Sequence, residues 1–128
     1  RGDIPVYSAS KFDKEALGYV SDKITRIVPK AIKFKGEYIT VNADGSVGKV
    51  FLRNEEFYAN DVLNVIKVVN NKILPKYVLY ELQHRIVSLG YATWGYKLYK
   101  EKLRKIDIRI PINKSGEFDV ERQENIFN

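Results

Sequence analysis

One amphipathic segment in the middle of a strand-rich chain limits the fold more than any other feature. Its apolar residues recur at helical spacing on one face: Leu74, Val78, Leu82, Ile86 and Leu89. Pro75 suits the first turn of a helix, where the N–H group that proline lacks has no partner inside the helix. Gly90 suits the left-handed conformation that ends many helices. The pattern therefore predicts one long helix from Leu74–Pro75 to Gly90.

Much of the remaining chain has the alternation and composition of β-strands. The predicted strands are Ile4–Ser8, Leu17–Val20, Tyr38–Asn42, Val47–Arg53, Val62–Val69 and Ile106–Ile112. Pro5 restricts the first strand to an edge position or places the proline at the strand start. Asp44–Gly45 is a turn signal that predicts a hairpin between the third and fourth strands. The nearly all-apolar run Val62–Val69 fits a strand buried on both faces.

Two further segments predict short helices, Lys97–Lys105 and the first turns of a helix at Asp119–Asn128. Between them, Ile106–Ile112 alternates apolar and polar residues, which is typical of a strand with one apolar face. The order of elements is not a regular alternation of strand and helix. The sequence therefore predicts an α+β fold with a mixed, mostly antiparallel twisted sheet, one long helix and one or two short helices.

The chain has 128 residues, the size of one ordinary domain, and carries a net charge of +6 with a pI near 9.4. The positive charge lies in two blocks, residues 23–36 and 76–105, whereas residues 107–128 are mostly acidic. Basic blocks that also contain tyrosine favour a surface that follows nucleic-acid phosphates. Two solvated faces are the alternative interpretation.

Cysteine and methionine are both absent from the chain. Without cysteine there can be no disulfide, thiolate nucleophile or thiolate zinc site. No apolar run is long enough to cross a bilayer, and no leader precedes the first strand. We therefore expect a cytoplasmic protein with no membrane partner. Because even position 1 is not methionine, we also expect a piece of a longer protein.

Motifs of catalysis are incomplete or missing in the sequence. Gly45–Lys49 resembles part of a phosphate-binding loop, but Ala43 and Val50 stand where that motif needs glycine and serine or threonine. No acidic residue has lysine two positions later, as many metal-dependent nucleases do. His84 lies opposite or beside the apolar stripe of the predicted helix, so we expect a surface or boundary residue rather than a catalyst. We expect no catalytic site, no metal and no cofactor.

Several segments together resemble one known family. The matching segments are Gly2–Ser10, Gly18–Val20, Ile39–Phe51, Phe57–Val62, Leu74–Tyr80, Lys97–Pro111 and Phe118–Ile126. In this order they resemble the target recognition domains of specificity subunits in type I restriction–modification systems. The same domain type occurs in fused type II restriction–modification enzymes. The chain departs from the family pattern at Ile112, where a second proline is common, and it lacks the long helix that joins two recognition domains.

The resemblance implies a domain like the DNA methylase specificity domain, which reads one part of a bipartite site in double-stranded DNA. Residues 1–118 would form the target recognition domain, and residues 119–128 would begin a truncated connecting helix. Methyltransferase and nuclease/translocase subunits would supply all of the chemistry. In a fused enzyme, that chemistry would lie elsewhere in the same chain.

Recognition of DNA needs cations for phosphates together with polar and planar groups for base edges. The predicted contacts are Ser8, Ser10, Lys11, Lys33, Lys35, Asn42, Ser46, Lys49, Tyr91, Thr93, Trp94, Tyr96, Lys97 and Lys100, with Lys30 as a further phosphate candidate. Trp94 fits a core position and a DNA contact equally well. Asn42 fits the role of a turn residue, whose side chain bonds its own backbone, even better than the role of a residue that reads bases.

Substitution of Lys97 or Lys100 by alanine is expected to weaken binding at all DNA sequences, because each lysine neutralises a phosphate. Thr93→Ala is expected to change preference at one base pair. Three other functions remain open: a catalytic nuclease fragment, an RNA-binding module that stacks bases on tyrosines, and a protein-interaction domain that is basic by accident.

Overall fold

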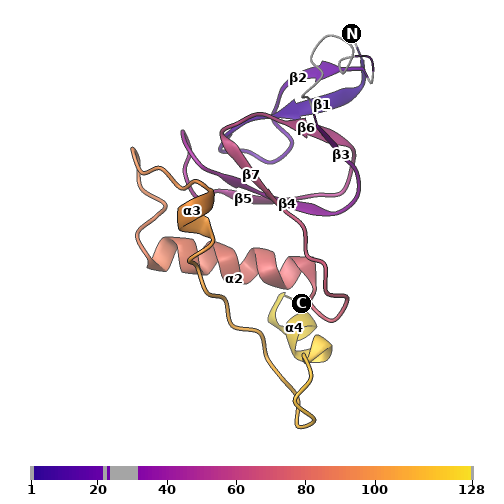
Figure 1. The fold of residues 1–128 in the computed structure, drawn as a ribbon, viewed down its shortest axis with the longest axis vertical. Coiled ribbons are helices and arrows are strands. Elements are labelled where there is room, and N and C mark those ends of the chain that lie inside the picture. Colours follow the sequence, from indigo (N-terminus) through magenta and orange to yellow (C-terminus); the bar gives the residue numbers. More distant parts are fainter. Residues whose placement is uncertain (1, 22, 24–31, 128) are drawn as a thin grey trace.

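A computed structural model describes residues 2–21, 23 and 32–127 of the chain (Figure 1). Four strands form one sheet in the order β2-β1-β6-β3: β1 (Ile4–Tyr7), β2 (Ala16–Val20), β3 (Lys33–Phe34) and β6 (Phe57–Ala59). Three strands form a second sheet in the order β5-β4-β7: β4 (Tyr38–Asn42), β5 (Val50–Arg53) and β7 (Leu63–Ile66). The β1–β6 pair is parallel and the other pairs are antiparallel.

This arrangement confirms the predicted α+β class and the mixed, mostly antiparallel pairing. The strands are divided between two sheets rather than gathered in one, and the pattern did not predict β3 or β6. Pro5 lies opposite Tyr19 of β2, whereas the pairing with β6 begins at Val6. β1 is thus an inner strand of the sheet. Pro5 lies near its start, at a position that pairs with β2 but not with β6.

Helix α2 (Pro75–Ser88) confirms the long predicted helix and lies across the three-stranded sheet (Figure 1). The sheet and helix enclose the main core, which contains Ile39, Val41, Val47, Val50, Val78, Leu82, Ile86 and Leu98. Gly90, at φ 75°, ends the helix, and its N–H donates to the carbonyl of Val87 at 3.0 Å. The N–H of Tyr91 donates to the carbonyl of Ile86, also at 3.0 Å. These paired bonds turn the chain back over the helix end.

The predicted strand Ile106–Ile112 is extended but joins no sheet in the described structure, and only Ile112 forms a bridge, with Phe118. Side chains of α2 bond its backbone instead of a neighbouring strand. The Tyr77 hydroxyl donates to the carbonyl of Arg109, and the Arg85 guanidinium donates to that of Asp107 at 3.0 Å. The strand prediction was therefore wrong in its pairing, although Ile106 and Ile108 pack against the core and Ile110 is half-buried.

Three other predicted elements are shorter in the structure, and one of them is the strand Val47–Arg53, since β5 begins only at Val50. Helix α3 spans only Lys100–Leu103 of the predicted Lys97–Lys105. Strand β7 covers the middle of the run Val62–Val69, and it is not buried on both faces, since Asn64, Val65 and Ile66 are half-buried. Val69 is 86% exposed. The chain leaves the sheet after Ile66 and continues to α2. Apolar composition alone therefore overestimated the length of the strand.

Helix α4 (Val120–Phe127) confirms the predicted C-terminal helix and packs against α2. The carboxylate of Asp119 accepts a hydrogen bond from the N–H of Arg122 at 3.0 Å, which caps the first turn. Gln123 is fully buried, and its side chain bonds the backbone of Leu74 and Lys72, each at 2.8 Å. The division at residue 118 between a recognition domain and a connecting helix stays a prediction.

Candidate nucleic-acid interface

Three segments predicted as DNA contacts meet in the structure. The side-chain amide of Asn42 donates to the carbonyls of Ser10 at 2.8 Å and Ser46 at 2.9 Å. The N–H of Leu98 donates to the carbonyl of Ala43 at 2.8 Å. We call residues 8–11, 43–49 and 91–98 the three-loop cluster. Most predicted contacts lie in this cluster, although long stretches of sequence separate its segments.

Asn42 holds the cluster together from beneath and is not on its surface. Its side chain is completely buried, and its amide nitrogen donates hydrogen bonds to two backbone carbonyls. The amide oxygen of Asn42 is buried without a hydrogen-bond partner among the described residues. The structure thus makes Asn42 a buried link between two loops rather than a turn residue that bonds its own backbone, and it removes Asn42 from the surface that could read bases.

The loop between β4 and β5 lies directly against the end of α2. A Cβ atom added at Gly48 would lie 2.8 Å from Cγ2 of Ile86 and 3.1 Å from Cβ of Ala92. Gly48 also has φ 82°, a conformation that strongly favours glycine. Close packing of the loop thus depends on this residue. Next to it, Lys49 is exposed, and Ser46 is half-buried.

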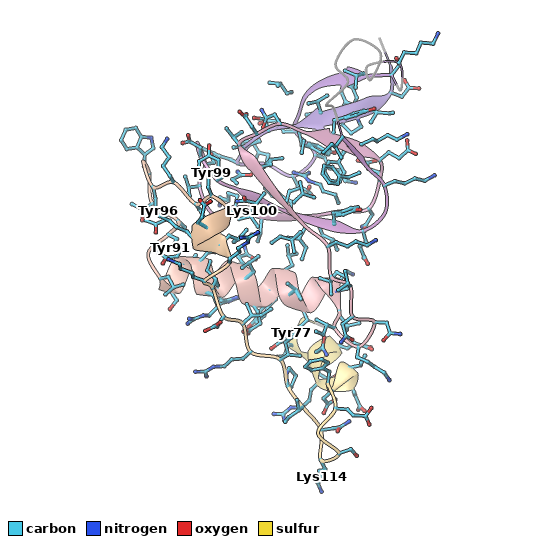
Figure 2. The ribbon with its side chains drawn as sticks, in the orientation of Figure 1. Tyr77, Tyr91, Tyr96, Tyr99, Lys100 and Lys114 are labelled. Atoms are coloured by element: carbon cyan, nitrogen blue, oxygen red, sulfur yellow. The ribbon has the colours of Figure 1, made fainter. Side chains whose placement is uncertain are left out.

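The segment 91–98 presents one fully exposed aromatic ring and two that are packed. Trp94 is 94% exposed, so the core position that its sequence allowed is excluded in this structure. The rings of Tyr91 and Tyr96 stack with centroids 4.7 Å apart and planes 14° apart, and both pack against the main core. The ammonium of Lys102 lies 4.2 Å from the centre of the Tyr96 ring. Figure 2 shows both tyrosines at the C-terminal end of α2.

Lys97 and Asp44 connect two loops of the cluster. The Lys97 ammonium lies 2.6 Å from a carboxylate oxygen of Asp44, and both side chains are at least partly exposed. The hydrogen bond from Lys97, followed by that from the N–H of Gly45, lowers the pKa of Asp44 below its ordinary value. Thr93, in the same loop as Lys97, donates its hydroxyl to the carbonyl of Gly90 at 2.8 Å and is exposed.

The loop after β1 is fixed by a buried arginine that the sequence did not single out. The guanidinium of Arg53 donates to Asp13 at 3.0 Å and to the hydroxyl of Thr40 at 3.1 Å. It also lies 3.8 Å from the centre of the Tyr7 ring. Burial lowers the pKa of Arg53 and raises that of Tyr7 to about 12. In the sequence, Arg53 is one cation among many, and nothing marks it as buried.

The three predicted contacts of this first loop differ in their surroundings. Lys11 is exposed and makes no ion pair among the described residues. The hydroxyl of Ser10 bonds Glu15 and accepts the N–H of Phe12 at 3.1 Å. The hydroxyl of Ser8 accepts a hydrogen bond from the amide of Asn60 at 2.8 Å. Lys11 is therefore the residue of this loop with the most freedom to contact a phosphate.

Lys33 and Lys35 lie apart from the cluster, at the far edge of the four-stranded sheet. Lys33 belongs to β3, which pairs with β6 alone. Both ammonium groups lie near the carboxylate of Glu56, at 3.8 Å for Lys33 and 3.7 Å for Lys35. The structure does not bring these two lysines to the other predicted contacts. Lys30 lies outside the described residues.

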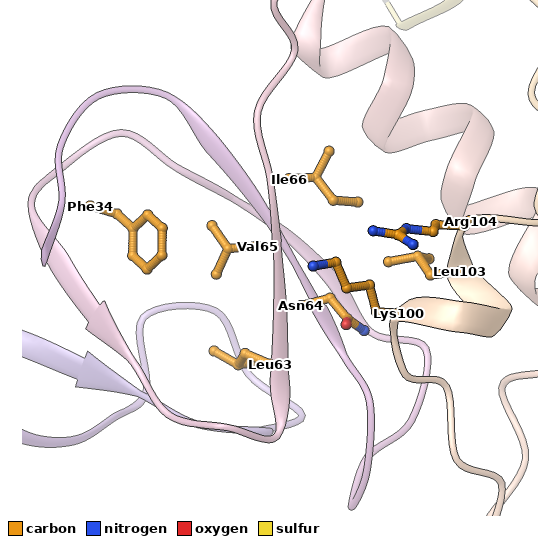
Figure 3. A pocket seen from close by; sticks show the side chains of 8 residues that line it. All are labelled: Phe34, Leu63, Asn64, Val65, Ile66, Lys100, Leu103 and Arg104. Atoms are coloured by element: carbon orange, nitrogen blue, oxygen red, sulfur yellow. The ribbon is translucent and has the colours of Figure 1, made fainter. Parts of the chain in front are cut away.

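Lys100 is turned away from the other predicted contacts. Together with Arg104 it lines a groove beside β7, and Figure 3 shows both side chains directed toward that strand. The sequence treated Lys100 as one more phosphate contact next to Lys97. Its position at the start of α3, however, gives it different neighbours.

Helix α2 carries the one histidine of the chain. His84 is exposed, as predicted, and its Nδ1 lies 2.8 Å from the carbonyl of Tyr80. Among the described residues, no three histidine, aspartate or glutamate side chains form a group that could hold a metal ion. In the same part of the chain, no helix has the length and apolar character needed to span a membrane.

Comparison with known proteins identifies the family. All 128 residues match the type I restriction modification DNA specificity domain. A Mycoplasma pneumoniae protein whose name assigns it to the N-terminus of a type I specificity subunit is 33% identical over 109 residues, covering 84% of this chain and 54% of that protein. The specificity subunit of the type I restriction enzyme MpnII, from the same organism, is 38% identical over 82 residues.

The second alignment covers 64% of this chain and 22% of the MpnII subunit, so the chain spans about half or less of these relatives. No solved structure matches it at a significant level. The match over the full chain is nevertheless sufficient for assignment. This chain belongs to the family of type I restriction modification DNA specificity domains.

Proposed function

We propose that this domain recognises one part of a double-stranded DNA site through the three-loop cluster. The observation that carries the proposal is the convergence of residues 8–11, 43–49 and 91–98, held by the side chain of Asn42 and by the Lys97–Asp44 ion pair. Single loops of this size offer few contacts. Three loops on a rigid support can contact phosphates and base edges in one defined register.

Phosphate contacts are assigned to Lys11, Lys49 and Lys97. Lys11 and Lys49 are exposed and have no ion pair among the described residues. Lys97 is tied to Asp44, but an ammonium group has three donors, so one bond to a carboxylate leaves two for a phosphate. The ion pair fixes where the remaining donors are placed, which favours a defined register over free sliding.

Base contacts are assigned to Thr93 and Trp94. The hydroxyl of Thr93 is held by the Gly90 carbonyl, so its methyl group and remaining lone pairs are presented in one orientation. Trp94 places a large planar ring almost wholly in solvent, where an isolated soluble domain gains little from it. Insertion of such a ring at a base step or against a thymine methyl would bury that surface.

Two tyrosines of the three-loop cluster give no support to the RNA-binding alternative. Tyr91 and Tyr96 stack on each other and pack on the core, so their faces are not free for unpaired bases. Chemistry on DNA would be supplied by methyltransferase and nuclease/translocase subunits, and we place the complete assembly in the cytoplasm. The recognition domain itself would carry no catalytic group.

Titration of the 128-residue chain with duplex DNA at several salt concentrations tests this function. Trp94 is the one tryptophan in the sequence, so its fluorescence reports the cluster directly. We expect quenching on binding, and each of Lys49→Ala and Lys97→Ala should lower the slope of log K against log salt by about 1. Lys114→Ala is the matched control, since Lys114 lies in the turn at the opposite end of the molecule (Figure 2). Equal effects of all three substitutions would refute the assignment.

A further inference from the structure

Strand β7 is an edge strand whose outer side borders a groove. It pairs with β4 and with no other strand in the described structure. The groove has a volume of about 530 Å³ and is lined by all four residues of β7 together with Phe34, Lys100, Leu103 and Arg104. Residues from both faces of β7 line the same groove, so it wraps around the strand edge (Figure 3).

The backbone of β7 directs unpaired groups toward this groove. In an antiparallel pair, alternate residues use both backbone groups on the partner strand. The N–H of Ala43 donates to the carbonyl of Val62 at 2.9 Å, and the ladder continues from this pair to Val41–Asn64. Leu63 and Val65 therefore turn their backbone groups away from β4. The N–H of Leu63 bonds Asn60 at 3.3 Å, but no described residue bonds the N–H or carbonyl of Val65.

Two cations stand beside this open edge. Lys100 and Arg104 come from α3 and the turn that follows it, and Figure 3 shows both directed toward β7. Neither makes an ion pair with any residue in the described part of the chain. Phe34 on one side and Leu103 on the other add apolar walls. The groove thus combines strand-pairing groups, apolar surface and uncompensated positive charge.

We propose that the edge of β7 binds an extended peptide segment of a partner protein, in which apolar and acidic side chains are combined. The segment would add to the three-stranded sheet as a further strand, with acidic side chains toward Lys100 and Arg104 and apolar ones toward Phe34 and Leu103. This site is separate from the three-loop cluster and does not depend on DNA recognition by that cluster.

The unpaired backbone groups of β7 favour a peptide over DNA as the occupant of the groove. Val65 offers an N–H donor and a carbonyl acceptor side by side, and a peptide strand satisfies both. A phosphate group at neutral pH accepts hydrogen bonds but has no donor for the carbonyl. The sugar–phosphate backbone of DNA in this groove would therefore offer no donor to the carbonyls of Leu63 and Val65.

Selection from a library of random 12-residue peptides on the 128-residue chain tests the proposal. We expect enrichment of peptides rich in glutamate, aspartate and β-branched residues. A selected peptide should shift the amide NMR signal of Val65, and Lys100→Glu or Arg104→Glu should weaken its binding by about tenfold or more. Lys105→Glu is the matched control, because Lys105 is exposed on the same short segment and does not line the groove.

N-methylation of the selected peptide separates strand addition from charge attraction. Every second N–H of the bound peptide would point toward β7. Methylation of those nitrogens should abolish binding, while methylation of the nitrogens that point away should have little effect. Equal tolerance of both sets would overturn the proposal, as would enrichment of no peptide or signals that move only in the three-loop cluster. Weakened duplex binding by Lys100→Glu, with no selected peptide at this site, would assign the groove to DNA instead.

Discussion

The side-chain amide of Asn42 donates a hydrogen bond to the carbonyl of Ser10 at 2.8 Å, across 32 residues of sequence. The same nitrogen bonds the carbonyl of Ser46, so one buried side chain joins the loop after β1 to the loop between β4 and β5. The Lys97–Asp44 ion pair adds the third loop at the surface. Assembly of the proposed DNA-binding surface therefore depends on Asn42 at the end of β4 and on Asp44 in the loop that follows it.

Substitution of Asn42 by alanine is expected to destabilise the fold by about 1–3 kcal/mol, because the carbonyls of Ser10 and Ser46 lose their donor. DNA binding should weaken as well, since the first two loops would no longer be held together. Denaturant unfolding and duplex titration measure the two effects. Asn54→Ala, at an exposed asparagine with no side-chain bond among the described residues, should change neither. An unchanged free energy of unfolding in Asn42→Ala would contradict the structural role.

The carboxyl of Asp44 is expected to titrate below the ordinary range of aspartate, because Lys97 and the N–H of Gly45 bond its charged form. A carboxyl NMR titration of the folded chain measures this pKa. Lys97→Ala should move the pKa of Asp44 back toward its ordinary value. Since the pKa of Asp44 is lowered by folding, the ion pair should persist at neutral pH and be lost as the pH falls through that lowered value. An identical Asp44 titration in both proteins would exclude the ion pair in solution.

Tyr7 is expected to make the fold sensitive to alkaline pH. Burial, followed by the hydrogen bond to Glu55, raises its pKa to about 12, above the ordinary value of 10.0. A raised pKa means that the stabilisation is complete below pH 10 and is lost as the pH rises through 12. The loss that depends on Tyr7 should reach about 2–3 kcal/mol. The difference in unfolding free energy between wild type and Tyr7→Phe should therefore shrink or reverse from pH 9 to about 12. A constant difference would refute this role.

Trp94→Ala should separate binding from stability. The ring is 94% exposed, so its removal should change the unfolding free energy by less than about 0.5 kcal/mol. Loss of a ring that contacts bases should weaken duplex binding by about fivefold or more. Val69→Ala is a suitable control, because Val69 is also highly exposed and lies outside the cluster. Unaltered affinity in Trp94→Ala would remove this residue from the interface.

Patterns that depend on nearby residues were predictable, whereas long-range partners were not. Helix α2 followed from the spacing of Val78, Leu82 and Ile86, because the helical period itself decides which face is buried. The alternation of Ile106–Ile112 correctly predicted that Ile106 and Ile108 pack inward, but Ile112 is exposed, and α2 side chains rather than a strand bond the backbone of this segment.

The same distinction applies to the candidate site. Composition and resemblance selected the loops that meet, but burial of Asn42 depends on the position of Ser10, and exposure of Trp94 depends on how Tyr91 and Tyr96 fill the space at the helix end. Neither outcome is contained in local sequence. The two-residue strand β3 is too short for any periodic signal, so its edge position and the groove beside Phe34 could not be predicted.

Selection of bound sequences from random double-stranded DNA at moderate salt tests the central claim most directly. The domain is predicted to enrich a short asymmetric motif, and Thr93→Ala is predicted to relax preference at one position of that motif. Enrichment of a motif that Thr93→Ala and Trp94→Ala leave unchanged would move recognition away from the three-loop cluster. Absence of binding even at low salt would contradict DNA recognition by this chain.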